Sequence, residues 1–409
     1  KLGWLEQTYL MGGSMFYNYN LYHLFCQTVR NMMDAQTAEG LIPDIAPEYV
    51  HFDDGFRDSP DWGSAGVILP WMIWEWYGDK GVMKSAWPMM RKYVDYLGTT
   101  AKGHIVSHGL GDWYDLGPKF PGEAQLTPKA LTATAIYYYD VKLLSRMAEI
   151  LNYNAEAQQL SSLSNEIKKA FNDVFFNPQT GIYSTGSQTA MAMPLCVGLV
   201  DDNNRDAVLN NLVASINQSG KALTAGDVGF HFLVKALEDG GQSQLLYDMN
   251  SRNDVPGYGF QLKKGATSLT ESWAALEEVS NNHLMLGHIM EWFYSGLGGI
   301  KQDKQSVAFK EVEIRPETVG DITEAQASYQ SPFGVIKSEW TRKDGIFTLK
   351  VEVPVNASAT VYLPATDPKA VTEGDKVITD QKGIRFERIE KGKALYKIGS
   401  GAYVFKVNM

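Results

Sequence analysis

The stretch AEAQQLSSLSNEIKKAFNDVFF, residues 155–176, decides the class of this fold. Its apolar residues recur at i, i+3, i+7, i+11 and i+14, which is the period of one face of an α-helix: Leu160, Leu163, Ile167, Phe171 and Val174. Such a stripe has to be buried against other elements. The stretch therefore predicts an amphipathic helix that packs within a larger helical core.

Further helices are predicted on both sides of this stretch. Thr127-Pro128 places an N-cap hydroxyl before a first-turn proline, and the helix that begins there continues to about Leu151. Helical patterns also fit 14–37, 64–79, 83–98, 188–200, 203–218, 228–238, 242–250 and 282–297. The last of these carries an apolar stripe of Leu286, Ile289, Met290, Phe293 and Leu297. The set approaches that of a two-layered α/α barrel, which we expect over residues 1–300.

The pattern changes to strands after Gly298-Gly299-Ile300. In 346–353 apolar and polar residues alternate, which is typical of a half-buried strand, and Asp344-Gly345 joins it to a strand at 335–342 as a hairpin. The same alternation occurs over 359–363 and 403–407. We therefore expect a β-sandwich domain over 301–409. Nine of the ten tryptophans precede residue 300, so aromatic surface for a ligand belongs to the helical part.

Composition excludes several classes of function. Lys plus Arg is 37 against 47 for Asp plus Glu, and a net charge of -10 disfavours binding to nucleic acid. Apolar residues make up 44%, yet no run reaches the ~18 uncharged residues of a membrane span. Only two cysteines occur, Cys26 and Cys196, so no disulfide framework is expected. We expect no cofactor and no metal cluster, although isolated carboxylates could hold a structural calcium ion.

The start of the chain, Lys1-Leu2-Gly3-Trp4, has none of the features of a signal peptide. Either the mature protein begins here or the sequence is a piece of a longer protein. The sequence also has no Walker lysine loop, no strand-linked GxGxxG, no HExxH and no Gly-x-Ser-x-Gly elbow. Phosphate, dinucleotide, zincin and esterase chemistry therefore lack their minimal motifs.

Tryptophans beside carboxylates are the most suggestive feature. An aromatic plane suits the apolar C–H face of a sugar, and a nearby carboxylate accepts hydrogen bonds from its hydroxyls. The alternative is that the tryptophans are core residues and the carboxylates cap helices. The pairs are Trp4 with Glu6, Asp61 with Trp62, Asp112 with Trp113, and Glu271 with Trp273.

The segment GYGFQLKKGATSLTESW, 257–273, is the best candidate for catalysis. Glu271 lies among uncharged neighbours, which would desolvate its carboxylate and make it a stronger base toward water. Alternatively it is a first-turn helix residue stabilised by the helix dipole. His283 could orient a sugar hydroxyl or simply cap the following helix.

At these residues the chain resembles glycoside hydrolase family 78, the bacterial α-L-rhamnosidases. The similar blocks occur in family order and cover nearly the whole helical part: LGWLEQTYLMG (2–12), GLIPDIAPEY (40–49), DSPDWGSAGVILPW (58–71), GDW (111–113), LTAGDVGF (223–230), GATSLTESW (265–273) and NHLMLGHIMEWFY (282–294). The resemblance implies an (α/α)6 barrel followed by a β-sandwich. It also implies hydrolysis of terminal α-L-rhamnosides from glycosides or plant-type polysaccharides, with inversion of configuration.

The resemblance assigns roles residue by residue. The family's general base falls on Glu271, although Thr270 stands where the family usually has Trp. A sugar-binding histidine falls on His283, and pocket tryptophans fall on Trp4, Trp62 and Trp113. The family's general acid precedes the position of Lys1, so we expect it upstream of this chain, with Lys1 near the rim of the pocket. An Asp that usually follows Gly-Trp is matched only by Glu6 or Gln7.

Two other classes of function stay open. The chain could be a carbohydrate-binding protein without a general acid, or another α/α-barrel enzyme, either a glycosidase for a different sugar or a polysaccharide lyase. A lyase needs positive charge near a uronate, and Lys263-Lys264 is the candidate pair, unless these are solvated loop residues. The partner expected in each case is a carbohydrate. Related polysaccharide-degrading enzymes suggest a periplasmic or secreted location.

Overall fold

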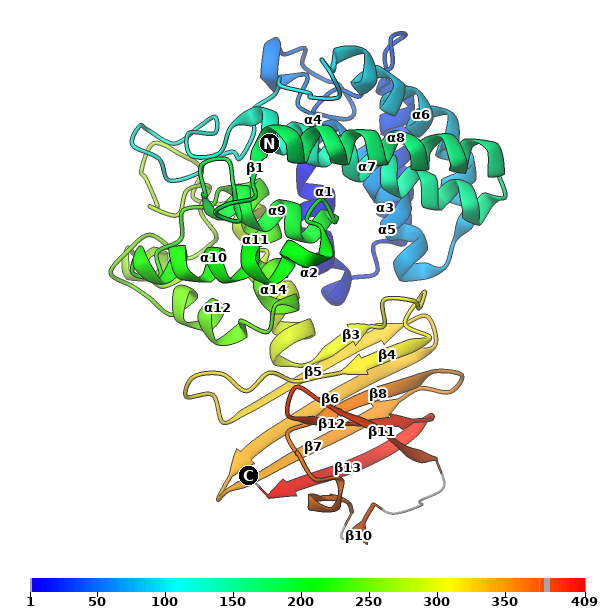
Figure 1. Ribbon diagram of the computed structural model, residues 1–409, viewed down its shortest axis with the longest axis vertical. Coiled ribbons are helices and arrows are strands. Elements are labelled where there is room, and N and C mark those ends of the chain that lie inside the picture. The colour runs from blue at the N-terminus through cyan, green and yellow to red at the C-terminus, as the bar shows by residue number, and fades with distance from the viewer. Residues whose placement is uncertain (1, 375, 379–382, 409) are drawn as a thin grey trace. The chain divides into compact units, whose positions relative to one another are not determined.

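The computed structural model describes residues 2–374, 376–378 and 383–408, which form two compact units. The first unit is mainly helical and contains the chain up to Gly13 together with Leu21–Ile73 and Asp79–His288. The second contains Ser14–Asn20, Trp74–Gly78 and the chain from Ile289 onward, and it carries both large sheets (Figure 1). The predicted fold class, a helical barrel followed by a β-sandwich, is confirmed. The predicted boundary at residue 300 stays a prediction.

The α-helices before residue 288 differ in length and are joined by connections that range from one residue to long loops (Figure 1). They are α1 (Glu6–Leu10), α2 (Gly12–Asn18), α3 (Tyr22–Ala35), α4 (Pro60–Gly63), α5 (Ala65–Tyr77), α6 (Lys80–Thr100), α7 (Lys129–Leu151), α8 (Asn154–Phe175), α9 (Gln188–Val197), α10 (Arg205–Gln218), α11 (Asp227–Asp239), α12 (Ser243–Asn250) and α13 (Tyr258–Lys263). The short strands β1 (Phe176–Asn177) and β2 (Ile182–Tyr183) pair as a hairpin after α8.

Helices α7 and α8 form the most closely packed pair of the first unit. Helix α7 is buried on nearly every side, and it ends at Asn152, which adopts the left-handed conformation (φ 64°) of a helix C-cap. On α8 the side chains of Leu160, Ile167 and Phe171 are buried, as predicted. Val174, one residue before the end of α8, is 59% exposed, so its predicted place in the buried stripe is wrong.

Two predicted helices are interrupted. The region 14–37 forms α2 and α3 as separate helices, because Ser14–Asn20 belongs to the second unit and α3 to the first. The region 282–297 contains a 3-10 turn (Leu284–Leu286), the short α14 (Ile289–Trp292) and a π-helix (Phe293–Leu297). Gly287 follows the 3-10 turn and lies close to Met11, since a side chain there would come within 2.7 Å of Met11 Cε. The predicted stripe fails with the continuous helix, since Met290 and Phe293 are exposed.

The second unit is built on two sheets. Their strands are β3 (Ile300–Gln302), β4 (Glu311–Ile314), β5 (Glu324–Ser331), β6 (Gly334–Lys343), β7 (Ile346–Val353), β8 (Ser358–Leu363), β9 (Val371–Glu373), β10 (Lys376–Val377), β11 (Ile384–Glu390), β12 (Lys393–Ile398) and β13 (Gly401–Asn408). One sheet has the order β10-β9-β13-β7-β6-β5 and the other β11-β12-β8-β4-β3. Tyr396 and Phe405, both fully buried, meet between the sheets with ring centroids 6.4 Å apart, as in a sandwich core.

An aromatic cluster completes the core of the second unit. Tyr17 and Trp76 come from the two short segments that precede residue 80, and their rings meet edge to face at 5.0 Å. Both contact Tyr329 of β5, and Trp76 also lies 5.1 Å from Phe309. Because all four rings are buried, these two segments are part of the hydrophobic core of the β-rich unit.

Candidate active site

Glu271 lies in an irregular segment between α13 and the 3-10 turn, so the alternative of a first-turn helix residue is wrong. Its backbone N–H donates to the Ser280 carbonyl oxygen at 2.9 Å, and the Ser280 N–H donates to Glu271 Oε2 at 3.2 Å. The side chain is half-buried rather than fully desolvated. The segment therefore fixes the carboxylate while leaving part of it accessible.

Trp273 holds the segment that carries Glu271 in place. Its indole ring has no exposed surface, packs against Phe230 and Tyr258, and donates from Nε1 to the Ala225 carbonyl oxygen at 2.8 Å. Thr270 and Ser272, on either side of Glu271, are also fully buried. Because the residues on both sides of Glu271 are buried, the backbone that carries its half-buried carboxylate is held in place.

A row of aromatic side chains brings two predicted tryptophans together. Trp4 stacks on Phe52 with ring centroids 5.3 Å apart, Phe52 contacts Phe56, and Phe56 meets the edge of Trp113 at 5.5 Å. Tyr114 continues the row at 5.1 Å from Trp113. Burial and then the negative charge of Glu271 raise the pKa of Tyr114. The aromatic row, Trp4 to Tyr114, therefore ends within electrostatic reach of Glu271.

A hollow lies in the same segment of the chain, although Glu271 is not among its lining residues. It has a volume of about 470 Å³ and is lined by residues 264–267 and 274–278 with Asn281, the stretches that precede and follow Glu271 in the chain. Lys1 lies outside the described residues, so its predicted place at the rim is not described. Trp4, three positions later, is half-buried in the aromatic row.

Three predicted sugar contacts lie beneath the surface instead. Trp62 is 2% exposed, and Asp112 and Trp273 are 0% exposed, so a direct contact with substrate is at odds with their burial. Asp112 accepts hydrogen bonds from Gly226 N–H, Gly229 N–H and the Thr189 hydroxyl at 3.0, 2.7 and 2.5 Å. It therefore ties the loop before Trp113 to the start of α11, which is the capping role that the sequence left open for it.

His283 also shows a capping role. Its Nδ1 accepts a hydrogen bond from the Met285 N–H at 3.2 Å and so caps the 3-10 turn that follows. The His283 N–H donates to the Leu269 carbonyl oxygen at 2.8 Å, two positions before Glu271. The backbone that carries the half-buried His283 ring is thus hydrogen-bonded to the Glu271 segment. A contact between this ring and a sugar stays a prediction.

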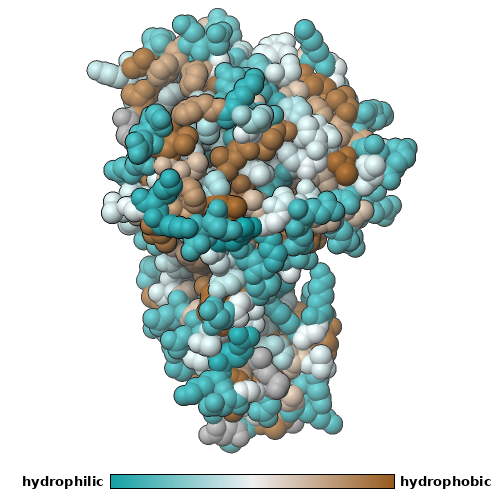
Figure 2. Space-filling model, turned by 90° about the vertical axis from the view of Figure 1, so that its left-hand side faces the viewer, coloured by the Kyte–Doolittle hydropathy of each residue, from teal (hydrophilic) through white to brown (hydrophobic). Residues whose placement is uncertain are grey.

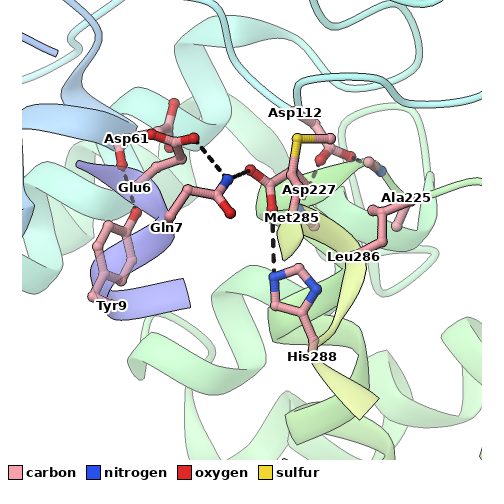
Figure 3. A network of polar contacts seen from close by, with 12 residues as sticks. Glu6, Gln7, Tyr9, Asp61, Asp112, Ala225, Asp227, Met285, Leu286 and His288 are labelled. Atoms are coloured by element: carbon pink, nitrogen blue, oxygen red, sulfur yellow. Dashed lines mark hydrogen bonds and ion pairs between the residues drawn. The ribbon is translucent and has the colours of Figure 1, made fainter. Parts of the chain in front are cut away.

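A buried polar network joins the parts of the site (Figure 3). The Gln7 amide nitrogen donates to Glu6 Oε1 at 2.7 Å and to Asp227 Oδ2 at 3.1 Å. Asp227 Oδ1 lies 3.4 Å from His288 Nε2, and the Asp227 N–H donates to the Trp113 carbonyl oxygen at 2.8 Å. Asp227 therefore connects α1, the Trp113 loop and the segment that ends at His288.

The charges of this network are constrained by burial. Burial and then the charge of Asp227 raise the pKa of Glu6 well above its usual range. Burial, followed by the charges of Asp112 and Glu271, raises the pKa of Asp227 in the same direction. Both pKa shifts have the same cause, because a low dielectric disfavours the charged form of a carboxylate beside another carboxylate. Glu6, predicted as a sugar contact, is only 4% exposed and acts within this network.

Sequence reasoning missed Asp227 and His288 as members of the site, and Phe52 and Phe56 as members of the aromatic row. Gln7 is one of the two loose matches to the family's Asp, but its hydrogen bond to Asp227 was not predicted. Phe52 precedes Asp53, and Phe56 follows Asp54-Gly55. Each phenylalanine therefore lies close in sequence to a carboxylate, which is the criterion that selected the tryptophans. A search that included phenylalanine would have found them. Nothing local to Asp227 indicates that the Gln7 amide reaches it across 220 positions of sequence.

Asp61 gives a pH prediction for the first unit. Complete burial raises the pKa of Asp61 to about 7, and the Thr132 hydroxyl at 3.3 Å is its side-chain hydrogen-bond donor. Since the folded pKa lies above the unfolded value, this group stabilises the fold below about pH 4, and the contribution is lost as the pH rises through 7. In the wild type this group lowers the free energy of unfolding as the pH rises from 4 to 8. We expect that decrease to be smaller by a few kcal/mol in Asp61→Asn.

Urea denaturation of the wild type and the variant at several pH values measures this effect. Asp34→Asn is the matched control, because Asp34 is exposed on α3. Parallel pH profiles for the wild type and Asp61→Asn would contradict a protonated Asp61 in the folded protein.

In the described part of the chain, Cys26 and Cys196 are not joined in a disulfide. Across residues 2–374, 376–378 and 383–408, no group of three or more His, Cys, Asp and Glu side chains is arranged to hold a metal ion. None of the described helices is both long and apolar enough to span a membrane. On the face drawn in Figure 2, hydrophilic and hydrophobic residues are interspersed.

A half-buried carboxylate beside an aromatic row, in a helical barrel followed by a β-sandwich, is the arrangement of a six-hairpin type of glycosidase. The model of the bacterial alpha-L-rhamnosidase 6 hairpin glycosidase domain matches residues 1–297, and that of the bacterial alpha-L-rhamnosidase C-terminal domain matches 299–377. This chain therefore belongs to the bacterial alpha-L-rhamnosidase family, which confirms the resemblance found in the sequence.

Individual relatives agree with this family. An alpha-L-rhamnosidase of Streptomyces avermitilis is 29% identical over 419 residues, which cover 100% of this chain and 38% of the relative. The crystal structure of a Streptomyces avermitilis alpha-L-rhamnosidase complexed with L-rhamnose matches with a TM-score of 0.90 and 29% identity, covering 99% of this chain and 38% of that one. An alpha-L-rhamnosidase from Dictyoglumus thermophilum has a TM-score of 0.91 and 27% identity, covering 100% and 46%. The chain thus spans less than half the length of these relatives.

Proposed function

We propose that the protein hydrolyses terminal α-L-rhamnosides with inversion of configuration, with Glu271 as general base. The observation that carries this proposal is the fixed, half-buried carboxylate of Glu271, held by Ser280 and lying near Tyr114 at the end of the aromatic row. Family membership supports the rhamnoside, since a relative at 29% identity was crystallised with L-rhamnose.

The proposed step needs a water between Glu271 and the anomeric carbon of the sugar. Glu271 takes a proton from this water, whose oxygen forms a bond to the anomeric carbon as the bond to the glycosidic oxygen breaks. A carboxylic acid from residues that precede Lys1 donates a proton to the leaving oxygen. The hydrogen bond from the Ser280 N–H suits the role of Glu271 as a base, because an ionised carboxylate accepts hydrogen bonds and cannot donate them. Trp4 and Trp113 supply aromatic surface for the sugar.

The other candidate functions have less support. A polysaccharide lyase would use Lys263 and Lys264 to hold a uronate. Lys263 is exposed at the end of α13, and Lys264 Nζ lies 5.5 Å from the ring of Phe260, so this pair fits solvated loop residues. A carbohydrate-binding protein without catalysis would keep the aromatic row but would not depend on Glu271 for any reaction.

Product stereochemistry tests the proposal. Following hydrolysis of an aryl α-L-rhamnoside by proton NMR, in a protein that includes the residues upstream of Lys1, is expected to show the β-anomer of rhamnose first. In an inverting enzyme the carboxyl groups of the general acid and the general base are roughly 6.5–9.5 Å apart, which leaves room for the attacking water. Early appearance of the α-anomer, or turnover of a panel of other aryl glycosides in place of the rhamnoside, would overturn it.

The 409-residue chain itself gives a second test. Because the proposed acid is absent from it, we expect turnover of an unactivated rhamnoside to be about 10²–10⁴-fold lower than that of a protein with the upstream residues. Aryl rhamnosides with leaving groups of decreasing pKa measure this, since a good leaving group needs less protonation. Equal rates for both proteins with a poor leaving group would place the acid within residues 1–409.

A further inference from the structure

The loop that follows Glu271 closes on Glu271 itself. Residues 272–279 lead away from Glu271 and back to Ser280, and two hydrogen bonds join the two ends of the loop. The Glu271 N–H donates to the Ser280 carbonyl oxygen at 2.9 Å, and the Ser280 N–H donates to Glu271 Oε2 at 3.2 Å. The direction of the second bond depends on how the peptide unit that carries the Ser280 N–H is held.

That peptide unit consists of the Val279 carbonyl and the Ser280 N–H. A peptide unit is planar, and in its trans form the C=O and the N–H point in opposite directions. Because the N–H is directed at Glu271 Oε2, the Val279 carbonyl oxygen is directed away from that carboxylate. A group that binds this carbonyl oxygen therefore fixes the plane in which the Ser280 N–H lies.

The side chain of Asn281 binds this carbonyl oxygen. Its Nδ2 donates to the carbonyl oxygens of Val279 and Leu276, at 3.2 Å in each case. Carbonyl oxygens only accept hydrogen bonds, so the amide nitrogen, which carries two protons, has to face them. A hydrogen bond to the carbonyl also polarises the peptide unit and strengthens the bond that its N–H donates. Asn281 thus acts on the Ser280 N–H from the far end of the same peptide.

We propose that Asn281 is a positioning residue for the general base, an inference that rests on the proposed role of Glu271. Asn281 holds the Val279–Ser280 peptide so that its N–H stays directed at Glu271 Oε2. A carboxylate held in this way presents its other oxygen to the attacking water in one orientation. The other role open to this exposed side chain is contact with the substrate, since Asn281 also lines the hollow of about 470 Å³.

Kinetics with an aryl α-L-rhamnoside test this role, in a protein that includes the residues upstream of Lys1. Asn281→Ala is expected to lower kcat about three- to tenfold with little change in KM, because the lost hydrogen bond acts on the base. Asn281→Leu keeps the bulk of the side chain without its donors, and we expect the same loss. The matched control is Asn211→Ala, which is expected to keep the wild-type kcat. Asn211 Nδ2 also donates to two carbonyl oxygens, those of Thr180 and Gly181, at 2.8 and 3.1 Å.

A double variant separates a role through Glu271 from a general effect on the loop. Because the amide in Glu271→Gln cannot act as a base, adding Asn281→Ala is expected to change the residual kcat by less than about twofold. An equal loss in both backgrounds, or a rise in KM with kcat unchanged, would overturn the proposal.

The single variants show which of the two roles fails. Wild-type kcat in both Asn281 variants, beside a large loss in Glu271→Gln, would overturn the role of Asn281 alone. Retention of activity by Glu271→Gln would overturn the role of Glu271 as the base, and the role of Asn281 with it.

Discussion

Replacing Glu271 by Gln is expected to lower kcat for an aryl α-L-rhamnoside by about 10²–10⁴-fold, measured in a protein that includes the residues upstream of Lys1. The substitution keeps the size of the side chain and its acceptor for the Ser280 N–H, but the amide cannot take a proton from water. Because the loss is in the chemical step, KM is expected to change little.

Glu149→Gln is the control for this substitution, since Glu149 is exposed on α7 and does not line the hollow beside the Glu271 segment. It is expected to keep the wild-type kcat. A carbohydrate-binding protein would show no turnover in either form. If Glu271→Gln retained most of the activity, another carboxylate would have to be the base, and the role of Glu271 would be lost.

Replacing Trp273 by Ala is expected to reduce the free energy of unfolding by about 3–5 kcal/mol, as for other large buried rings. The substitution opens a cavity beside Phe230 and leaves the Ala225 carbonyl oxygen without the indole donor. Because Trp273 supports the segment that carries Glu271, kcat is expected to fall even at temperatures where the variant is folded. Chemical denaturation and kinetics at low temperature measure the two effects separately.

Trp340→Ala provides an equally buried control. The Trp340 indole is fully buried in β6 and donates to the Leu297 carbonyl oxygen at 2.8 Å, the same bond length as that of Trp273. We expect a similar loss of stability without a loss of kcat in the folded protein. If both variants lost activity in proportion to their stability alone, Trp273 would have no special role in placing Glu271.

Local sequence patterns were enough to predict the regular elements. Alternation predicted β7 at 346–353 with its observed bounds, and the cap at Thr127-Pro128 predicted a helix close to the observed α7. The pattern failed over 282–297, where a 3-10 turn, the short α14 and a π-helix stand in place of one continuous α-helix. A periodic stripe records which residues are apolar, and it does not record where the type of helix changes along it.

The candidate site was predictable only in part, for a similar reason. The motif around Glu271 is local, and so its position could be read directly. Whether Trp62 or Trp113 presents its ring to a ligand depends on neighbours from other loops, and only Trp113 is half-exposed. The double hydrogen bond of Gln7 joins Glu6 to Asp227 over a separation of 220 residues, which no short-range pattern contains.

The contribution of Tyr17 and Trp76 to the core of the β-rich unit limits how this protein can be dissected. A fragment that starts at residue 301 would lack both rings and would expose Phe309 and Tyr329, which pack against Trp76. Such a fragment is expected to aggregate on expression. The β-rich part is therefore not a portable module, and a chimaera with a relative has to exchange Ser14–Asn20 and Trp74–Gly78 together with it.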